Sequence, residues 1–324
     1  MSSRTLDRLV RLAAAIGLLL FAVSAAARAQ VLSVAELNTE QLRGLDKAKT
    51  VVFLPVGILE EHGPYLPAYA DGFNSRRATR DVAEAVAGRG WTALVFPEIP
   101  LGVGGVNEVA AKYPFPGTYV VRAYTLRSIV MDLADELGEH GFRWVFIVNS
   151  HGAPNHNRVL DQASRYFVDT YGGQMLQLRG FGDAASGPNP ADTLTQQARD
   201  EDNGSGHAGI SETSAMLFLH PGLVAPGYKT APNFTSADMI ATASRADWAG
   251  YFGAPKYASA QYGALQQAAS SARRIQHAFA VLDGKASAPR PQAGPSRAAD
   301  EASLSRDAKI EARQQAWLKA NGLR

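Results

Sequence analysis

One continuous apolar run, Trp144–Val148, constrains the fold more than any other segment. A strand with apolar side chains at successive positions buries both of its faces, as strands do in parallel sheets that helices cover. Strand-like runs also occur at residues 51–56, 92–97 and 174–178, and the Trp144–Val148 run extends to Asn149. Helical patterns alternate with these runs. The alternation predicts an α/β layered fold with a mostly parallel central sheet flanked by helices.

The helical patterns are clearest at about residues 123–140 and 157–171, where apolar side chains recur at helical spacing. Beyond residue 285 the composition shifts to Ala, Pro, Ser and Arg, which is typical of a linker with little to bury. We therefore predict one domain over residues 30–285 and a tail over 286–324. The tail comprises an Ala/Pro-rich linker and a polar helix at about 304–318, and it is expected to be mobile or to dock on a neighbouring subunit.

The segment after the first strand-like run carries three residues of types that bind metals, Glu60, His62 and Asp71. If the extended backbone continues, Glu60 and His62 project from the same face, because side chains at i and i+2 align in a strand. Asp71 follows a loop limited by prolines, and its two carboxylate oxygens suit a bridge between two metals. The alternative is that Glu60 and Glu61 are solvated loop acids and that His62 is a turn residue.

The second polar segment begins where the long apolar run ends, and it contains His151. Ligands in open α/β folds gather at the carboxyl ends of strands, so His151 is well placed to bind a metal or a substrate. A structural histidine in a tight turn is the alternative.

The third segment contains His207 and Glu212 and opens an apolar run that is predicted to be helical. Ser211 or Thr213 is expected to cap this helix, which puts Glu212 in the first turn, where the helix dipole favours a carboxylate. The functional interpretation makes His207 a proton shuttle and Glu212 a further metal ligand.

Together these segments resemble the creatininase family of metal-dependent amidohydrolases over about residues 35–285. The resemblance rests on Pro55-Val56-Gly57-x-x-Glu60-x-His62-Gly63-Pro64-x-Leu66-Pro67-x-x-x-Asp71, Phe115-Pro116-Gly117-Thr118, Asn149-x-His151-Gly152 and His207-Ala208-Gly209-x-x-Glu212-Thr213-Ser214. It implies a creatininase-like fold and a homo-oligomer, commonly a hexamer. It also implies a pair of divalent metals bound by Glu60, His62, Asp71 and His151, with Asp71 as the bridge.

The sequence departs from the family pattern at several positions. Creatinine-cleaving members have a metal-binding Glu where this chain has Ala153. Members with a Gly-rich sequence there draw the missing carboxylate from the Glu-Thr-Ser motif, which here supplies Glu212. Glu61 and Tyr65 replace the usual Gln and His, and Pro154 alters the second loop. The departures leave the metal site in place and count against creatinine as the substrate.

The resemblance implies a hydrolase that cleaves a non-peptide C–N bond, in a cyclic amide or a formamide, with a metal-activated water. Two divalent ions lower the pKa of a shared water and polarise a carbonyl group. His207 is the candidate acid for the leaving nitrogen, and Glu212 is assigned to the site as a ligand and catalytic residue. Zinc is the first choice of metal, while manganese or iron suits the same ligands.

Two alternatives remain open at this point. A lactone or ester hydrolase keeps the metals and changes the bond that is cleaved. A non-catalytic exported binding protein on a decayed hydrolase scaffold is motivated by Ala153 and by the changes at Glu61 and Tyr65. Metal stoichiometry separates the classes, because a hydrolase is expected to hold about two ions per chain and a decayed site one or none.

The first 29 residues are predicted to be a secretory signal peptide that is cleaved after Ala29. Three arginines precede a short apolar stretch that ends in a small-x-small pattern before Gln30. An uncleaved anchor is the alternative, but the apolar stretch is short and rich in alanine. We therefore predict a periplasmic or secreted protein that is not inserted in a membrane after cleavage.

Charge and cysteine content exclude several classes of protein. The precursor carries a net charge of +2, and its first 29 residues contribute four Arg and one Asp, a net +3, which leaves the mature chain near −1. No basic stripe with interleaved aromatic residues indicates nucleic-acid binding. The chain has no cysteine, so it forms no disulfides and must hold any metal with His and carboxylate side chains. The expected partners are a small amide substrate and other copies of the chain.

Overall fold

The computed structural model describes residues 30–180, 189–204, 206–289 and 298–323. The predicted signal peptide and part of the predicted linker, residues 290–297, lie outside the described residues. Five parallel strands form one sheet in the order β1-β3-β2-β4-β5. Their bounds are β1 Val31–Ser33, β2 Thr50–Val56, β3 Thr92–Val95, β4 Trp144–Asn149 and β5 Gln174–Leu178.

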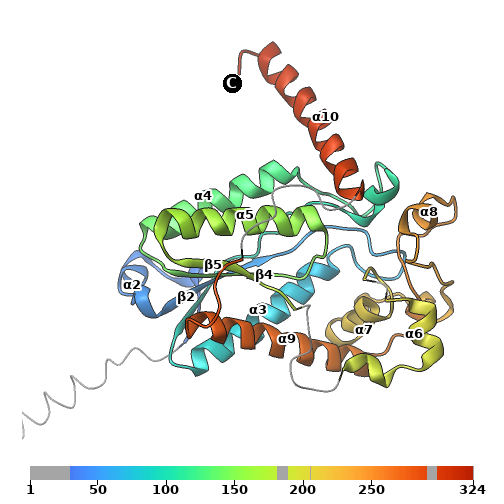
Figure 1. Ribbon diagram of the computed structural model, residues 1–324, viewed down its shortest axis with the longest axis horizontal. Helices are drawn as coiled ribbons and strands as arrows, with labels where there is room; N and C mark the ends of the chain where they lie inside the picture. Colours follow the sequence, from blue (N-terminus) through green and yellow to red (C-terminus); the bar gives the residue numbers. More distant parts are fainter. Residues whose placement is uncertain (1–29, 181–188, 205, 290–297, 324) are drawn as a thin grey trace, which may run out of the picture.

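The helices pack on both faces of this sheet (Figure 1). On one face, alternate strand residues such as Val52 and Ile147 pack against α4 and α5. On the other face, Phe53 and Phe146 pack with α3 and α9. The helices are α2 Thr39–Arg43, α3 Ala70–Gly88, α4 Ala123–Glu139, α5 Pro154–Tyr171, α6 Gln196–Asp202, α7 Ile210–Leu219, α8 Met239–Ser244, α9 Ala260–Leu282 and α10 Ala298–Ala320.

The predicted layered α/β architecture is confirmed, and the differences are local. Strand β1 is not predicted, because three residues are too few to show a pattern. Strand β3 ends two residues before its predicted end: Phe96 still donates a backbone hydrogen bond to Phe53, but Pro97 has no N–H to continue the ladder. Helix α5 begins at Pro154, three residues early, because proline is favoured in the first helical turn.

The topology places the two polar motifs of the sequence side by side. Strands β2 and β4 are neighbours at the centre of the sheet, and Val56 pairs with Asn149 at their carboxyl ends. The segments that leave the two strands therefore start at the same edge. Helices α6, α7 and α8 lie beyond this edge (Figure 1).

The tail of the chain forms helix α10, which covers the predicted polar helix. Its amino-terminal turns contact the short 3-10 helix η3, Val106–Ala110, of the same chain, and its remainder projects from the body of the molecule (Figure 1). Among the residues that the structure describes, no helix has the length and apolar character needed to cross a bilayer.

Candidate metal centre

The candidate ligands gather where β2 and β4 end. The strand does not continue to His62, because β2 ends at Val56, so the alignment of Glu60 and His62 expected for a continuing strand does not apply. The segment instead folds back: the Glu60 N–H donates to the carbonyl of Ala68 at 2.9 Å, and His62 Nδ1 lies 3.0 Å from the Glu60 carbonyl oxygen. Asp71 follows the proline-limited loop and lies in the first turn of α3. All three candidate ligands of this segment, Glu60, His62 and Asp71, are buried.

The first group of converging ligands consists of Glu60, Asp71 and His151. His151 Nδ1 lies 3.1 Å from Glu60 Oε2 and 3.0 Å from Asp71 Oδ2. The other ring nitrogen, Nε2, lies 3.1 Å from the carbonyl oxygen of Val103 and 3.2 Å from that of Gly104. A carbonyl oxygen can only accept, so these contacts place a proton on Nε2 and turn Nδ1 toward the two carboxylates.

The second group consists of His62, Asp71 and Glu212. His62 Nε2 lies 4.0 Å from Asp71 Oδ1 and 3.4 Å from Glu212 Oε2, and it is buried without a hydrogen-bond partner among the described residues. Because the backbone carbonyl of Glu60 holds a proton on Nδ1, Nε2 presents a lone pair to the carboxylates. Asp71 thus belongs to both groups, with Oδ2 toward one imidazole and Oδ1 toward the other.

These residues have the chemistry of a divalent-cation site. Two imidazole nitrogens that face buried carboxylates repel them unless a positive charge lies between. Burial lowers the pKa of His62, but Glu212, Asp71 and Glu60 outweigh burial and raise it to about 10. Burial likewise opposes protonation of His151, yet the same kind of contacts, led by Glu60, raise its pKa well above the ordinary value. The site thus favours a bound positive charge, and a metal ion can take the place of the protons.

His207 lies beside these groups and pairs with Glu61. His207 Nε2 is 2.9 Å from Glu61 Oε2, and its ring centroid is 4.6 Å from that of His62. Burial lowers the pKa of His207, but the charges of Glu60 and Glu61 outweigh it and raise the pKa to about 8. His207 also forms a third group of converging atoms with Glu60 and His62.

The sequence presents Glu61 as a departure from the family pattern or as a solvated loop acid, but the side chain is buried, and its pairing with His207 was not predicted. The two residues are 146 positions apart, and spacing says nothing about such a contact. The sequence feature that could have indicated a partner for Glu61 is its position between the candidate ligands Glu60 and His62. A buried carboxyl between two candidate ligands needs a partner of its own.

Glu212 combines both interpretations that the sequence leaves open. It lies in the first turn of α7, and its Oε2 accepts a hydrogen bond from the Ala208 N–H at 2.6 Å. The same oxygen is the atom that faces His62. The expectation that Ser211 or Thr213 caps this helix is wrong, since the N-cap is Gly209 and no side-chain hydrogen bond caps the helix there.

The groups open into a cavity of about 830 Å³. Glu60, Asp71, His151, His207 and Glu212 line its floor. Apolar side chains of η3 and α8 line its walls, together with Phe252 and with Ser303 of α10. Ala153, the residue before α5, also lines the cavity and contributes only a methyl group to it.

Comparisons with known sequences point to one family. The sequence profile of the Creatininase family, described as creatinine amidohydrolase, matches residues 35–276. The creatinine amidohydrolase of Pseudomonas putida is 30% identical over 182 residues, 54% of this chain and 66% of that protein. The mycofactocin precursor peptide peptidase of Mycobacterium ulcerans (strain Agy99) is 29% identical over 195 residues, 58% of this chain and 66% of that protein. The matched segment spans slightly under two thirds of each relative.

Solved structures of creatininase share the fold. A tryptophan-to-phenylalanine variant of creatininase, type II, is 26% identical with a TM-score of 0.59, and the match covers 79% of this chain and 99% of that chain. A manganese form of creatininase, 23% identical with a TM-score of 0.56 and the same coverage, supports the fold alone. With the profile match over most of its length, the chain belongs to the creatininase family, a family of metal-dependent amidohydrolases.

Proposed function

We propose that this chain is an exported hydrolase that cleaves a C–N bond of a small amide with the help of two divalent cations. The substrate class is a cyclic amide, a formamide or a short peptide-like amide. The observation that carries the proposal is the shared position of Asp71, whose two oxygens face the lone-pair nitrogens of two different buried histidines. A single structural metal has no use for such a bridge.

The residues divide into ligands and a proton donor. Glu60 and His151 would hold one cation, His62 and Glu212 the other, and Asp71 both. When bound, such a pair of cations supplies a water of lowered pKa and polarises a carbonyl group. Glu61 accepts a hydrogen bond from His207 Nε2, which orients the ring and stabilises its protonated form. His207 then donates the proton on Nδ1 to the leaving nitrogen.

The pocket supports a small substrate other than creatinine. Its volume of about 830 Å³ lies within the usual range for small-molecule sites. The relatives named above are a creatinine amidohydrolase and a peptide peptidase, so both small cyclic amides and short peptides belong in a substrate panel. Ala153 leaves the pocket without the carboxylate that creatinine-cleaving members have there. We therefore expect turnover of creatinine to be slower than that of another amide in the panel.

The metal, the compartment and the assembly complete the proposal. Zinc suits two imidazoles with three carboxylates, and manganese or iron tolerates the same set. Residues 1–29 are proposed to direct export to the periplasm or the medium, with the mature chain beginning at Gln30. Sequencing the amino terminus of protein from the periplasmic fraction tests that boundary. A homo-oligomer, a hexamer by family resemblance, is tested by light scattering.

The decisive experiment measures metal and turnover on the same sample. Mature protein is stripped with a chelator, and zinc, manganese or iron is returned stepwise while hydrolysis of cyclic amides, formamides and short peptides is followed. Binding of about two ions per chain, with turnover that appears as the second ion binds, supports the proposal. Binding without turnover of any amide, but with cleavage of a lactone or ester, indicates the second hydrolase class. One ion or none with no turnover indicates a binding protein.

A further inference from the structure

Helix α10 reaches the candidate active site although it lies outside the family match at 35–276. Ser303, in its amino-terminal part, is 5% exposed and lines the same cavity as Glu60 and His151. The outer part of the helix is exposed to solvent, and Trp317 is 60% exposed. Only the inner turns of α10 are therefore built into the domain.

One contact of α10 is an ion pair with the 3-10 helix η3. Arg306 Nη1 lies 2.7 Å from Glu108 Oε1, and the Glu108 side chain is only 4% exposed. Ser303 also hydrogen-bonds to the Glu108 carboxyl group. The Arg306 guanidinium lies 4.5 Å from the centroid of the Tyr113 ring, which fixes its direction. A charged side chain this deeply buried requires such partners, so η3 depends on α10.

Helix η3 in turn holds a candidate metal ligand. The N–H of Val106, two residues before Glu108, donates a hydrogen bond to Glu60 Oε1. The other oxygen of Glu60 faces His151. One short helical turn therefore links the Arg306–Glu108 ion pair to the orientation of a carboxylate in the first ligand group.

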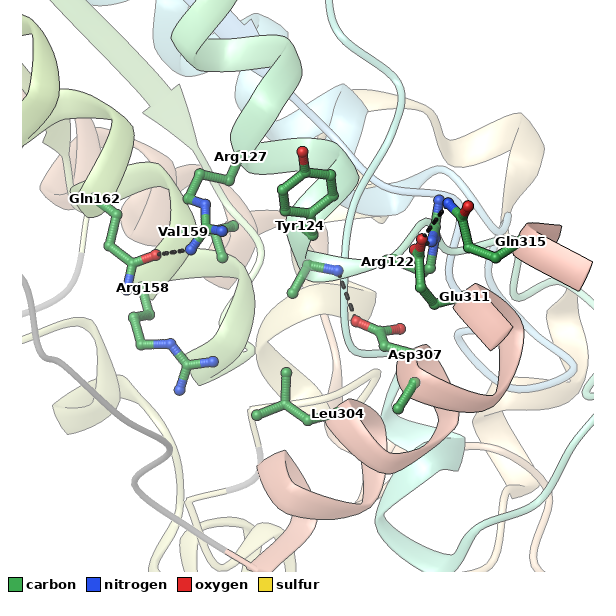
Figure 2. A pocket seen from close by; sticks show the side chains of 12 residues that line it. Arg122, Tyr124, Arg127, Arg158, Val159, Gln162, Leu304, Asp307, Glu311 and Gln315 are labelled. Carbon is green, nitrogen blue, oxygen red and sulfur yellow. Dashed lines mark hydrogen bonds and ion pairs between the residues drawn. The ribbon is translucent and has the colours of Figure 1, made fainter. Parts of the chain in front are cut away.

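A second set of contacts joins α10 to the start of α4. Asp307 Oδ2 accepts a hydrogen bond from the Ala123 N–H at 2.7 Å, and Glu311 forms an ion pair with Arg122. Figure 2 shows both acidic side chains beside Arg122, next to a cavity of about 620 Å³ between α10 and helices α4 and α5. Leu304 packs against the apolar core of that face. The inner half of α10 is thus held at two places.

We propose that Arg306 is a positioning residue and that α10 is a clamp on the active site. Through Glu108, Arg306 holds η3 and so keeps the Val106 N–H on Glu60, while Ser303 closes one side of the pocket. The carboxy-terminal extension thereby sets metal affinity and the size of substrate that enters. This inference rests on the proposed function for its link to metal and substrate, whereas the docking of α10 on η3 does not.

The test compares Arg306→Gln with Arg313→Gln in the mature full-length chain. Arg313 is an exposed residue of the outer part of α10, so its change controls for loss of one positive charge from the same helix. Three quantities are measured: hydrogen exchange of the amides of residues 104–112, the dissociation constant of zinc, and kcat and KM on the amide panel. For Arg306→Gln we expect faster exchange in 104–112, zinc binding weaker by about tenfold, and a raised KM. Arg306→Lys keeps the charge and is expected to recover part of each loss.

Two changes at Ser303 test the pocket wall separately: Ser303→Ala removes only its contact with Glu108, whereas Ser303→Phe removes that contact and also adds bulk. Relative to Ser303→Ala, we expect Ser303→Phe to raise KM most for the largest substrate of the panel while zinc affinity is the same in both variants. Exchange in 104–112 that is identical in Arg306→Gln and wild type would overturn the clamp. Faster exchange with unchanged zinc affinity and KM would overturn its link to the site. A wild-type chain that binds no metal would overturn the proposed function and that link with it, while the exchange result still decides the docking.

Discussion

The two candidate ligand groups, Glu60 with Asp71 and His151, and His62 with Asp71 and Glu212, differ in how firmly the fold holds them. In the group of Glu60, Asp71 and His151, every side chain is at most 5% exposed, and His151 is anchored on two backbone carbonyls. In the other group, the Glu212 side chain is 20% exposed and also serves the backbone at the start of α7. In the first group, Glu60 and His151 follow the two central strands, and Asp71 of α3 is shared by both groups. The second group takes Glu212 from the separate helix α7.

This difference predicts an order of metal binding. A group that is already oriented loses little conformational freedom when it binds, so the Glu60 group should bind its cation more tightly. The Glu212 group must give up or share a hydrogen bond to Ala208 as its cation enters. Two separate steps in a metal titration are the expected signature.

The largest effect is expected for Asp71→Asn, because Asp71 belongs to both groups. An amide keeps the shape of the side chain but removes the charge that two cations share. We expect bound metal to fall from about two ions to near none, and kcat/KM to fall by at least about 10³-fold. Metal analysis and steady-state kinetics on one preparation measure both. Glu84→Gln, an exposed change on the same helix, is the control, and retention of both ions by Asp71→Asn would remove Asp71 as the bridge.

The variant His207→Gln tests whether His207 is a proton donor or a metal ligand. If His207 is the proton donor, both metal steps persist and kcat falls by roughly 10²-fold, with Glu61→Gln producing a smaller loss. If His207 is a ligand with Glu60 and His62, one metal step weakens or disappears. Titration with zinc and measurement of kcat separate the two outcomes. His140→Gln, at a surface histidine with 71% of its side chain exposed, is the matched control.

Glu212→Gln tests the more loosely held group alone. The amide oxygen can still accept from the Ala208 N–H, so the start of α7 is kept while the charged ligand is lost. We expect the weaker metal step to disappear, the tighter one to remain, and kcat/KM to fall by about 10- to 100-fold. Calorimetric titration counts the steps. Two unchanged steps would make Glu212 a helix-cap residue only and would leave the second group without its carboxylate.

The candidate ligands that follow the central strands were predictable from the sequence, whereas the contacts between distant loops were not. Glu60, His62, Asp71 and His151 follow strands whose apolar patterns are plain, and neighbouring parallel strands bring their carboxyl ends together. The pairing of Glu61 with His207 and the docking of Arg306 on Glu108 join residues more than a hundred positions apart. Such contacts depend on how loops close in three dimensions, and local spacing does not encode them.

The smallest expected effect concerns His156, which contacts the backbone segment that holds His151 of the tighter group. Burial lowers the pKa of His156 well below its usual value, so the ring is neutral, and Nδ1 accepts a hydrogen bond from the Val103 N–H at 3.2 Å. The carbonyl of Val103 is one of the two that hold His151 Nε2.

His156→Leu removes the acceptor, while His156→Asn offers an oxygen near the same place. We expect the leucine variant to weaken only the tighter metal step, by about tenfold, and the asparagine variant to weaken it less. The reason is geometric: a loosened Val103 lets the His151 ring turn, and only the Glu60 group contains that ring. Zinc titration of both variants provides the measurement. Equal weakening of both steps would mean that Val103 supports the whole site, and that the two groups are held as one unit.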